Sequence, residues 1–313
     1  MTVWLATQTR AAINEALHAD GGATYRQWLG RVLPHMGDAY RADDSKRGHL
    51  GMSQIGAECA RAVALGFLWA SADKVRGRKG EPELDATGRM LRLWNRGHLE
   101  EGRFIALLLT IGVKVYQQDE QGNQFRVEDL GGHYSGSLDA ILTGVPDIPV
   151  GYSALGEFKT HNAKSFQKLV DEGVRVSKPL HYTQMMSYMQ RRGLLYGLYC
   201  AVCKDDDELY FEVVPYEDLT PSRATQRAHE VIFNDRLPPR VKGASPGFYL
   251  CKYMCDHKDV CFHTVAPQRH CRTCQHIRPL QDGTWACTLT GELRSKEQQL
   301  AGCQDYIVAD KFE

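Results

Sequence analysis

Residues 133–160 read HYSGSLDAILTGVPDIPVGYSALGEFKT, and the fold prediction depends mainly on their pattern. It contains two runs of strand-like composition, one around Asp139 and one around Glu157, separated by glycine- and proline-containing turns. Side chains alternate along a strand, so Glu157 and Lys159 share one face while Phe158 points to the other, into the core. We therefore expect neighbouring strands that bring two carboxylates and a lysine together.

This trio of side chains suits metal-assisted chemistry on phosphates. Asp139 and Glu157 would form an all-oxygen site of the kind that Mg²⁺ or Mn²⁺ prefers. Such an ion activates water and stabilises charge on a phosphate. Lys159 could orient that water, help to deprotonate it or hold the phosphate. The alternative interpretation is an exposed ion pair, because a Glu-x-Lys triplet occurs by chance in many proteins.

Helical and strand-like patterns continue on both sides of this stretch. Helices are predicted over residues 53–72, 85–111, 162–173, 178–192 and 220–235, and strands over 114–117, 124–128, 134–142, 154–160, 194–202 and 208–214. This order predicts an α/β fold with a mixed central sheet flanked by helices. We divide the chain into an N-terminal helical segment (1–52), a core (53–262) and a cysteine-rich module (263–313).

Composition and charge exclude several classes of protein. The 313 residues are 43% hydrophobic and 24% charged, with 38 basic against 38 acidic side chains. These values exclude a disordered, collagen-like or coiled-coil chain and a globally basic nucleic-acid binder, although a local basic groove remains compatible with them. No run approaches the roughly 18 apolar residues of a membrane span. The start, MTVWLATQTR, lacks a secretory pattern, so we expect a cytoplasmic protein without membrane contact.

Cysteines are concentrated at the C-terminal end, where seven of the ten lie in the last 63 residues. Disulfides are rare in a reducing compartment, so metal ligation is the favoured interpretation. One group fits a small zinc module of four thiolates, consisting of Cys271, Cys274, Cys287 and Cys303. His263, His270 or His276 could replace one thiolate. A polar segment this short needs such a staple to fold, whereas Cys200 and Cys203 are expected to be core thiols.

Several motifs follow one another in an informative order. They are Gly97-His-Leu-Glu-Glu101, Asp139, Glu157-x-Lys159, Gln184-Met-Met-Ser-Tyr188 and the turn Cys203-Lys-Asp-Asp-Asp-Glu-Leu-Tyr210. In this order and spacing they resemble the RecB-type branch of the PD-(D/E)xK nuclease superfamily, over roughly residues 53–262. The proline–aspartate of the superfamily name is missing before Asp139, as it often is in RecB-type members. The resemblance implies a restriction-endonuclease-like core.

The resemblance also implies roles for individual residues. Asp139, Glu157 and the Phe158 carbonyl would bind Mg²⁺ or Mn²⁺, and Lys159 would be the catalytic lysine. A helix would add a further ligand, for which Glu101 occupies the family position and His98, one turn earlier, is the rival. Gln184 and Tyr188 would contact the DNA backbone or brace the lysine; alternatively, the tyrosine packs into the core.

Some RecB-type members hold a 4Fe–4S cluster through one cysteine before the first catalytic helix and three after the last. Here these would be Cys59, Cys251, Cys255 and Cys261. The spacing C-x3-C-x5-C is one residue longer in its first gap than the family's C-x2-C-x5-C. The choice between an iron–sulfur cluster and zinc therefore stays open.

The function expected from these features is metal-dependent hydrolysis of DNA, by an exonuclease rather than an endonuclease, in recombination, repair or phage DNA processing. Arg92, Arg96, Lys164 and Lys168 could line a groove for DNA. A recombinase or single-strand-binding partner and an oligomer are compatible with the resemblance, in a bacterial or phage-infected cell. The alternative is a catalytically silent, metal-clamped DNA-binding or scaffold protein, against which the intact Asp139, Glu157 and Lys159 argue.

Overall fold

The computed structural model describes residues 2–40, 46–72 and 81–312, which fold into two compact units. Unit 1 comprises Met1–Ser45, Val75–Val127 and Ser137–Asp218, and unit 2 comprises Lys46–Lys74, Glu128–Gly136 and Leu219–Glu313. Each unit draws on segments that are distant in the sequence. The borders expected at 52/53 and 262/263 assumed contiguous segments and do not coincide with these units.

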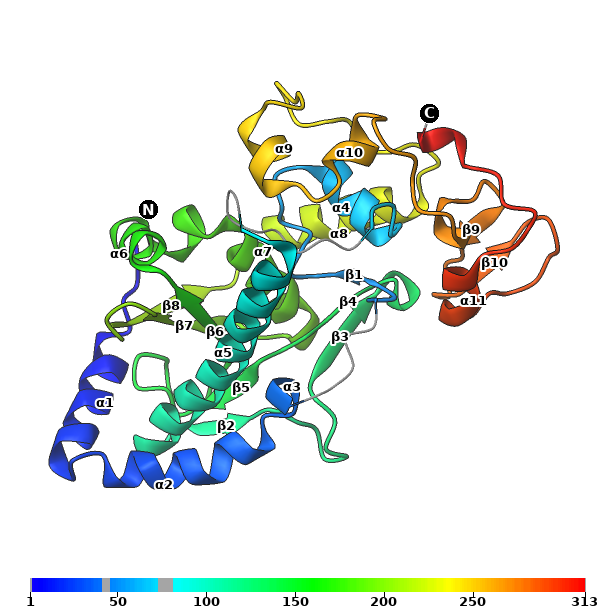
Figure 1. Ribbon diagram of the computed structural model, residues 1–313. Coiled ribbons are helices and arrows are strands. Elements are labelled where there is room, and N and C mark those ends of the chain that lie inside the picture. The colour runs from blue at the N-terminus through cyan, green and yellow to red at the C-terminus, as the bar shows by residue number, and fades with distance from the viewer. Residues whose placement is uncertain (1, 41–45, 73–80, 313) are drawn as a thin grey trace. The chain divides into compact units, whose positions relative to one another are not determined.

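Unit 1 is built on a five-stranded sheet with the order β2-β5-β6-β7-β8 (Figure 1). Its strands are β2 (Lys114–Tyr116), β5 (Ala140–Thr143), β6 (Ser153–His161), β7 (Tyr196–Cys203) and β8 (Leu209–Pro215). The β6–β7 pair is parallel and the other pairs are antiparallel. The predicted mixed sheet is therefore confirmed. The two parallel strands lie inside the sheet and are almost wholly buried, as strands covered on both faces are.

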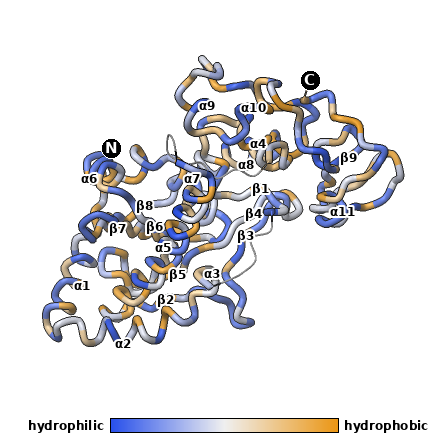
Figure 2. The backbone as a smooth tube through the Cα atoms, viewed as in Figure 1, coloured by the Kyte–Doolittle hydropathy of each residue, from blue (hydrophilic) through white to orange (hydrophobic). Residues whose placement is uncertain are grey.

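Helices cover this sheet on both faces. The helices of unit 1 are α1 (Thr7–Ala19), α2 (Ala23–Val32), α3 (Gly37–Tyr40), α5 (Glu83–Thr110), α6 (Ala163–Ser177) and α7 (Pro179–Arg192), with the short 3-10 helix η1 (Leu33–His35). Of these, α2 and α3 pack on α5 rather than on the sheet. Phe104 of α5 stacks on Phe158 of β6, with ring centroids 5.6 Å apart. A Cβ added at Gly197 of β7 would meet Met185 of α7. Hydrophilic and hydrophobic residues alternate along α1 and α2, as in amphipathic helices (Figure 2).

Two predicted elements differ from the structure. The predicted strand 134–142 is divided into β4 (Tyr134–Ser137) and β5, because the chain bends at Leu138 and Asp139. The bend turns Asp139 toward β6, where it accepts a hydrogen bond from the main chain. The helix predicted over 53–72 is only α4 (Ala60–Phe67), because tight turns with hydrogen bonds three residues apart precede it.

Unit 2 has less regular structure. Its helices are α4, α8 (Leu219–Phe233), α9 (Tyr249–Met254), α10 (Lys258–Cys261) and α11 (Lys296–Ala301), with the 3-10 helices η2 (Leu130–Gly132), η3 (Cys271–Thr273) and η4 (Asp310–Phe312). β9 (Ile277–Pro279) and β10 (Trp285–Cys287) form an antiparallel ribbon, and a further sheet has the order β1 (Leu50–Gly51), β4, β3 (Arg126–Asp129). Within residues 2–40, 46–72 and 81–312, no helix combines the length and apolar character needed to cross a bilayer.

Candidate active site

Asp139, Glu157 and Lys159 meet at one point of unit 1. Lys159 Nζ lies 3.7 Å from Asp139 Oδ2 and contacts Glu157 Oε1. The main-chain N–H of Phe158 donates to Asp139 Oδ2 over 2.9 Å, and Lys159 Nζ donates to the Phe158 carbonyl over 3.2 Å. The structure therefore brings together all four groups that the sequence singles out here. Phe158 itself is buried in the core, as alternation along the strand predicts.

The electrostatics of this group are dominated by burial. Glu157 is completely buried, and its Oε2 has no hydrogen-bond partner among the described residues. Burial raises the pKa of Glu157 to about 8; the Lys159 ammonium opposes this rise, and the Asp139 and Glu101 carboxylates add to it. Burial lowers the pKa of Lys159, but the Glu157 and Asp139 carboxylates outweigh burial and raise it overall. Lys159 is thus a cation throughout the physiological pH range.

Helix α5 contributes a third carboxylate. Burial raises the pKa of Glu101, the neighbouring His98 side chain lowers it, and the Asp139 carboxylate raises it further. His98 Nδ1 lies 3.5 Å from Glu101 Oε1. Both residues line a cavity of about 560 Å³ together with Lys159. Glu101 is the one of the two rivals that interacts with the Asp139 carboxylate, and His98 is its ion-pair partner.

Gln184 and Tyr188 lie on α7, next to the carboxylates. The side-chain amide of Gln184 donates to Tyr188 Oη over 3.4 Å, and both side chains are buried. Burial raises the pKa of Tyr188, and the Glu157 and Asp139 carboxylates raise it further. Neither residue is part of the cavity wall. Both side chains therefore pack inside unit 1, away from the cavity.

Sequence reasoning missed a hydrogen-bonded cluster beside Lys159. His161 Nε2 lies 3.0 Å from Tyr199 Oη, and His181 Nδ1 lies 2.8 Å from the same oxygen. Tyr199 of β7 is aligned with Glu157 in the parallel register. Burial lowers the pKa of His161 to about 4 and that of His181 to about 3, and lysine ammonium groups, including that of Lys159, lower both further.

Both histidines are therefore neutral. Tyr199 has one hydroxyl proton, so it donates a hydrogen bond to one histidine and its oxygen accepts a hydrogen bond from an N–H of the other. A signal for His161 was present in the sequence. It lies two residues beyond Lys159, so alternation along a strand places both side chains on the same face.

The basic residues that line the cavity besides Lys159 differ from the four predicted DNA contacts. Lys178 and Lys204 line it, and Lys178 Nζ donates to the main-chain and side-chain oxygens of Ser165 over 2.8 Å each. Among the described wall residues, none of the four predicted DNA contacts appears, namely Arg92, Arg96, Lys164 and Lys168. Arg96 donates to the Lys204 carbonyl over 3.1 Å, and Lys168 pairs with Glu172 over 3.7 Å.

The first cysteine group assembles within unit 2. Cys59, Cys251, Cys255 and Cys261 line one cavity of about 190 Å³, and Cys255 interacts electrostatically with the other three thiols. Cys59 precedes α4, whereas the other three lie on or beside α9 and α10. Four thiols around one cavity match in number either tetrahedral zinc or an iron–sulfur cluster.

Ligand geometry at the three predicted metal sites stays a prediction. In the described part of the chain, no three His, Cys, Asp or Glu side chains are grouped closely enough to hold a metal ion. The second cysteine group, consisting of Cys271, Cys274, Cys287 and Cys303, lines a separate cavity of about 170 Å³. Cys200 and Cys203 are buried in β7, which confirms that they are core thiols.

Comparisons with known proteins give distant matches only. No family model and no curated protein sequence matches the chain. The crystal structure of SSO0001 is 16% identical over 77% of this chain and 97% of its own, with a TM-score of 0.40. The alkaline exonuclease LHK-Exo from Laribacter hongkongensis is 14% identical over 66% of this chain and 90% of its own, with a TM-score of 0.38. LHK-Exo in complex with dAMP is 15% identical over the same shares, with a TM-score of 0.36.

Proposed function

We propose that this chain is a metal-dependent deoxyribonuclease of the PD-(D/E)xK type. The supporting observation is the contact of Lys159 Nζ with Asp139 and Glu157 beside a cavity that Glu101 also lines. Lys159 and Glu101 line this cavity, and Asp139 and Glu157 lie beside Lys159, so the group is suited to a divalent cation with a phosphate bound to it rather than to an apolar ligand. The proposal rests on these contacts within unit 1.

The residues present fit a divalent cation. The donor set would be the carboxylates of Asp139, Glu157 and Glu101 with the Phe158 carbonyl, all of them the hard oxygen ligands that Mg²⁺ and Mn²⁺ select. The buried Glu157 Oε2 lacks a hydrogen-bond partner among the described residues, and the pKa of Glu157 is raised, so a cation there would relieve an electrostatic cost. Such a cation would activate water and neutralise charge on the phosphate.

The protein's own groups have distinct parts in this mechanism. Lys159 stays protonated and can donate to a phosphate oxygen or to the attacking water. The hydrogen bond from Phe158 N fixes the position of the Asp139 carboxylate. Lys159 Nζ donates to the Phe158 carbonyl, which places the ammonium beside the oxygens that would hold the cation. Tyr188 and Gln184 hold the buried side of the cluster.

Substrate access would run through the 560 Å³ cavity. Its wall carries Lys178 and Lys204 besides Lys159, and these cations can neutralise the phosphates of a DNA strand. The preference for an exonuclease, the role in recombination or phage DNA processing and the partner proteins are predictions from the family resemblance.

The proposal is tested by digesting end-labelled linear and covalently closed circular DNA, single- and double-stranded, with Mg²⁺ or Mn²⁺. We expect wild-type protein to shorten linear DNA, to spare circles and to be inactive with EDTA. Cleavage of circular DNA would show that the protein is an endonuclease and not an exonuclease. Binding without any cleavage would overturn the proposal and favour the scaffold alternative. Lys114→Ala is a matched control, because Lys114 is exposed on β2, outside the cavity wall.

A further inference from the structure

A second set of four thiols surrounds its own cavity in the C-terminal part of unit 2. Cys271 and Cys274 stand at the two ends of η3, Cys287 ends β10, and Cys303 follows α11. All four line a cavity of about 170 Å³, and Cys271 interacts electrostatically with each of the other three. Residues up to 32 positions apart in the sequence thus meet at one point.

Two turns orient these thiols. The Cys274 N–H donates to the Cys271 carbonyl over 2.9 Å and closes the C-x2-C turn. The Gly291 N–H donates to the Cys287 carbonyl over 2.8 Å, and Gly291 adopts a positive φ of 73° that this turn requires. These two turns fix the backbone at Cys274 and Cys287, two of the residues that line the cavity.

The helices and strands around these thiols are too short to be stable on their own. Its ribbon has only three residues in each strand, and α11 has six residues. A two-stranded ribbon is marginally stable in water, and so short a helix does not form alone. Leu289, Leu293 and Ile307 are exposed rather than packed into a core. A bound metal would supply the missing stabilisation, as it does in small metal-stapled modules.

We propose that Cys271, Cys274, Cys287 and Cys303 bind one structural Zn²⁺ ion in a tetrahedral site. Each thiol loses its proton on binding, and the four sulfurs lie about 2.3 Å from the ion. In the structure the sulfurs line the cavity wall, and no three of the described potential ligands are grouped at metal-binding distance. Binding therefore needs rotations about the Cα–Cβ bonds that turn the sulfurs inward, between staggered rotamers.

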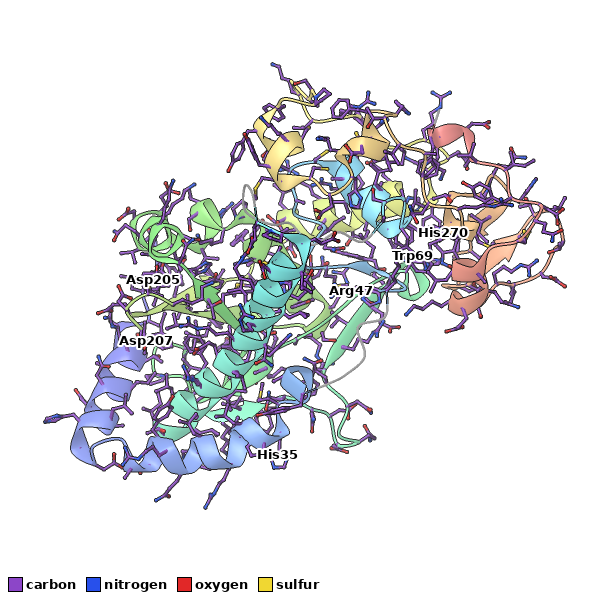
Figure 3. All side chains as sticks on the ribbon, in the orientation of Figure 1. His35, Arg47, Trp69, Asp205, Asp207 and His270 are labelled. Carbon is purple, nitrogen blue, oxygen red and sulfur yellow. The ribbon has the colours of Figure 1, made fainter. Side chains whose placement is uncertain are left out.

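The structure also narrows the choice of histidine ligands. His276 lines the same cavity. His270 Nε2 lies 2.9 Å from the Trp69 carbonyl, with its ring edge-on to the indole, and Figure 3 labels this pair. His263 uses Nδ1 for the Phe312 carbonyl and Nε2 for Arg240. His276 is thus the one candidate among these three that could substitute for a thiolate.

The first test is the metal content of the purified full-length protein, measured by elemental analysis. We expect one zinc per chain to be lost in Cys287→Ser and in Cys271→Ser and to be retained in Leu293→Ala, a control at an exposed residue outside the cavity wall. Cys255→Ser belongs to the other cysteine group and should also retain this zinc. Loss of iron instead of zinc in Cys287→Ser, or no loss of metal, would overturn the proposal.

The second test needs no variant and is independent of nuclease activity. Cys303 is exposed, so as a free thiol it would react rapidly with iodoacetamide. We expect peptide mapping to show Cys303 and its three partners protected in the native protein and alkylated after a zinc chelator is added. Rapid alkylation of Cys303 before chelation would contradict the site. A disulfide between any two of the four would also contradict it.

Discussion

The main-chain N–H of Phe158 donates a 2.9 Å hydrogen bond to the side chain of Asp139, which lies in the bend between β4 and β5. Asp139 is outside any strand, and this bond fixes its carboxylate against β6. Lys159 Nζ approaches the same oxygen, Oδ2, to 3.7 Å. One carboxylate oxygen is therefore shared between a structural hydrogen bond and the proposed catalytic lysine.

Substitution of Asp139 should separate these two roles. Asn keeps an oxygen that can accept from Phe158 N but removes the charge, so Asp139→Asn should fold normally and lose activity by about 100-fold or more. Asp139→Ala also loses the hydrogen bond, and its free energy of unfolding should fall by about 1 kcal/mol more than that of Asp139→Asn. DNA cleavage rates and urea unfolding measure the two effects. Equal stability of the two variants would exclude the structural role of this bond.

The stability of unit 1 should depend on pH through Glu157. Its pKa rises on folding from 4.5 to about 8, mainly because of burial. The folded state therefore binds more protons than the unfolded state between these values, and the free energy of unfolding falls as pH rises from about 4.5 to 8. Urea unfolding at pH 5 and pH 8 measures this fall. Glu157→Gln should show a smaller fall; an unchanged dependence on pH would refute the assignment to Glu157.

Tyr199→Phe should destabilise the sheet. The change removes the hydroxyl that lies 3.0 Å from His161 Nε2 and 2.8 Å from His181 Nδ1, leaving buried nitrogens without this partner. Such losses cost about 1–3 kcal/mol. Tyr196→Phe, on the same strand, is the control and should change the free energy of unfolding by less than about 1 kcal/mol. If both variants unfold alike in urea, the cluster contributes nothing to stability.

Arg272 should be irreplaceable by lysine. Its guanidinium lies 3.7 Å from the Trp69 ring centroid and 4.4 Å from that of Trp285, and it donates to the carbonyls of Phe67 and Gly48. Lysine cannot reproduce this planar fork, so Arg272→Lys should cost about 2–4 kcal/mol of unfolding free energy. Arg223→Lys is the control, because Arg223 is exposed on α8 and should change stability by less than about 1 kcal/mol. Tryptophan fluorescence during thermal unfolding reports on both variants.

Features that depend on local pattern were predictable from the sequence. Alternation along residues 154–160 correctly placed Phe158 on one face of the strand and Glu157 and Lys159 on the other. The predicted helix 85–111 corresponds closely to α5. The break at Asp139 was not predictable, because the residues on both sides have equal strand character and the bend depends on a bond to a distant main-chain N–H.

Side-chain neighbours that depend on the register of two paired strands could also not be predicted from the sequence. Tyr199 lies beside Glu157 only because β6 and β7 pair in parallel with one particular alignment, and His181 reaches it from α7. The cysteine groups were predictable because cysteines at short spacings indicate a metal site even when the fold is not known. Each group lines one cavity, and both the role of the thiols as metal ligands and the identity of the metals stay predictions.

The central claim is that Lys159 and its carboxylates cleave DNA. The most direct measurement is single-turnover cleavage of end-labelled linear DNA with Mg²⁺, with DNA binding measured on the same samples, for wild type, Lys159→Ala and the control Lys114→Ala. We expect wild type and the control to cleave alike, and Lys159→Ala to bind DNA but cleave it at least about 100-fold more slowly. Cleavage by Lys159→Ala at the wild-type rate would contradict the account.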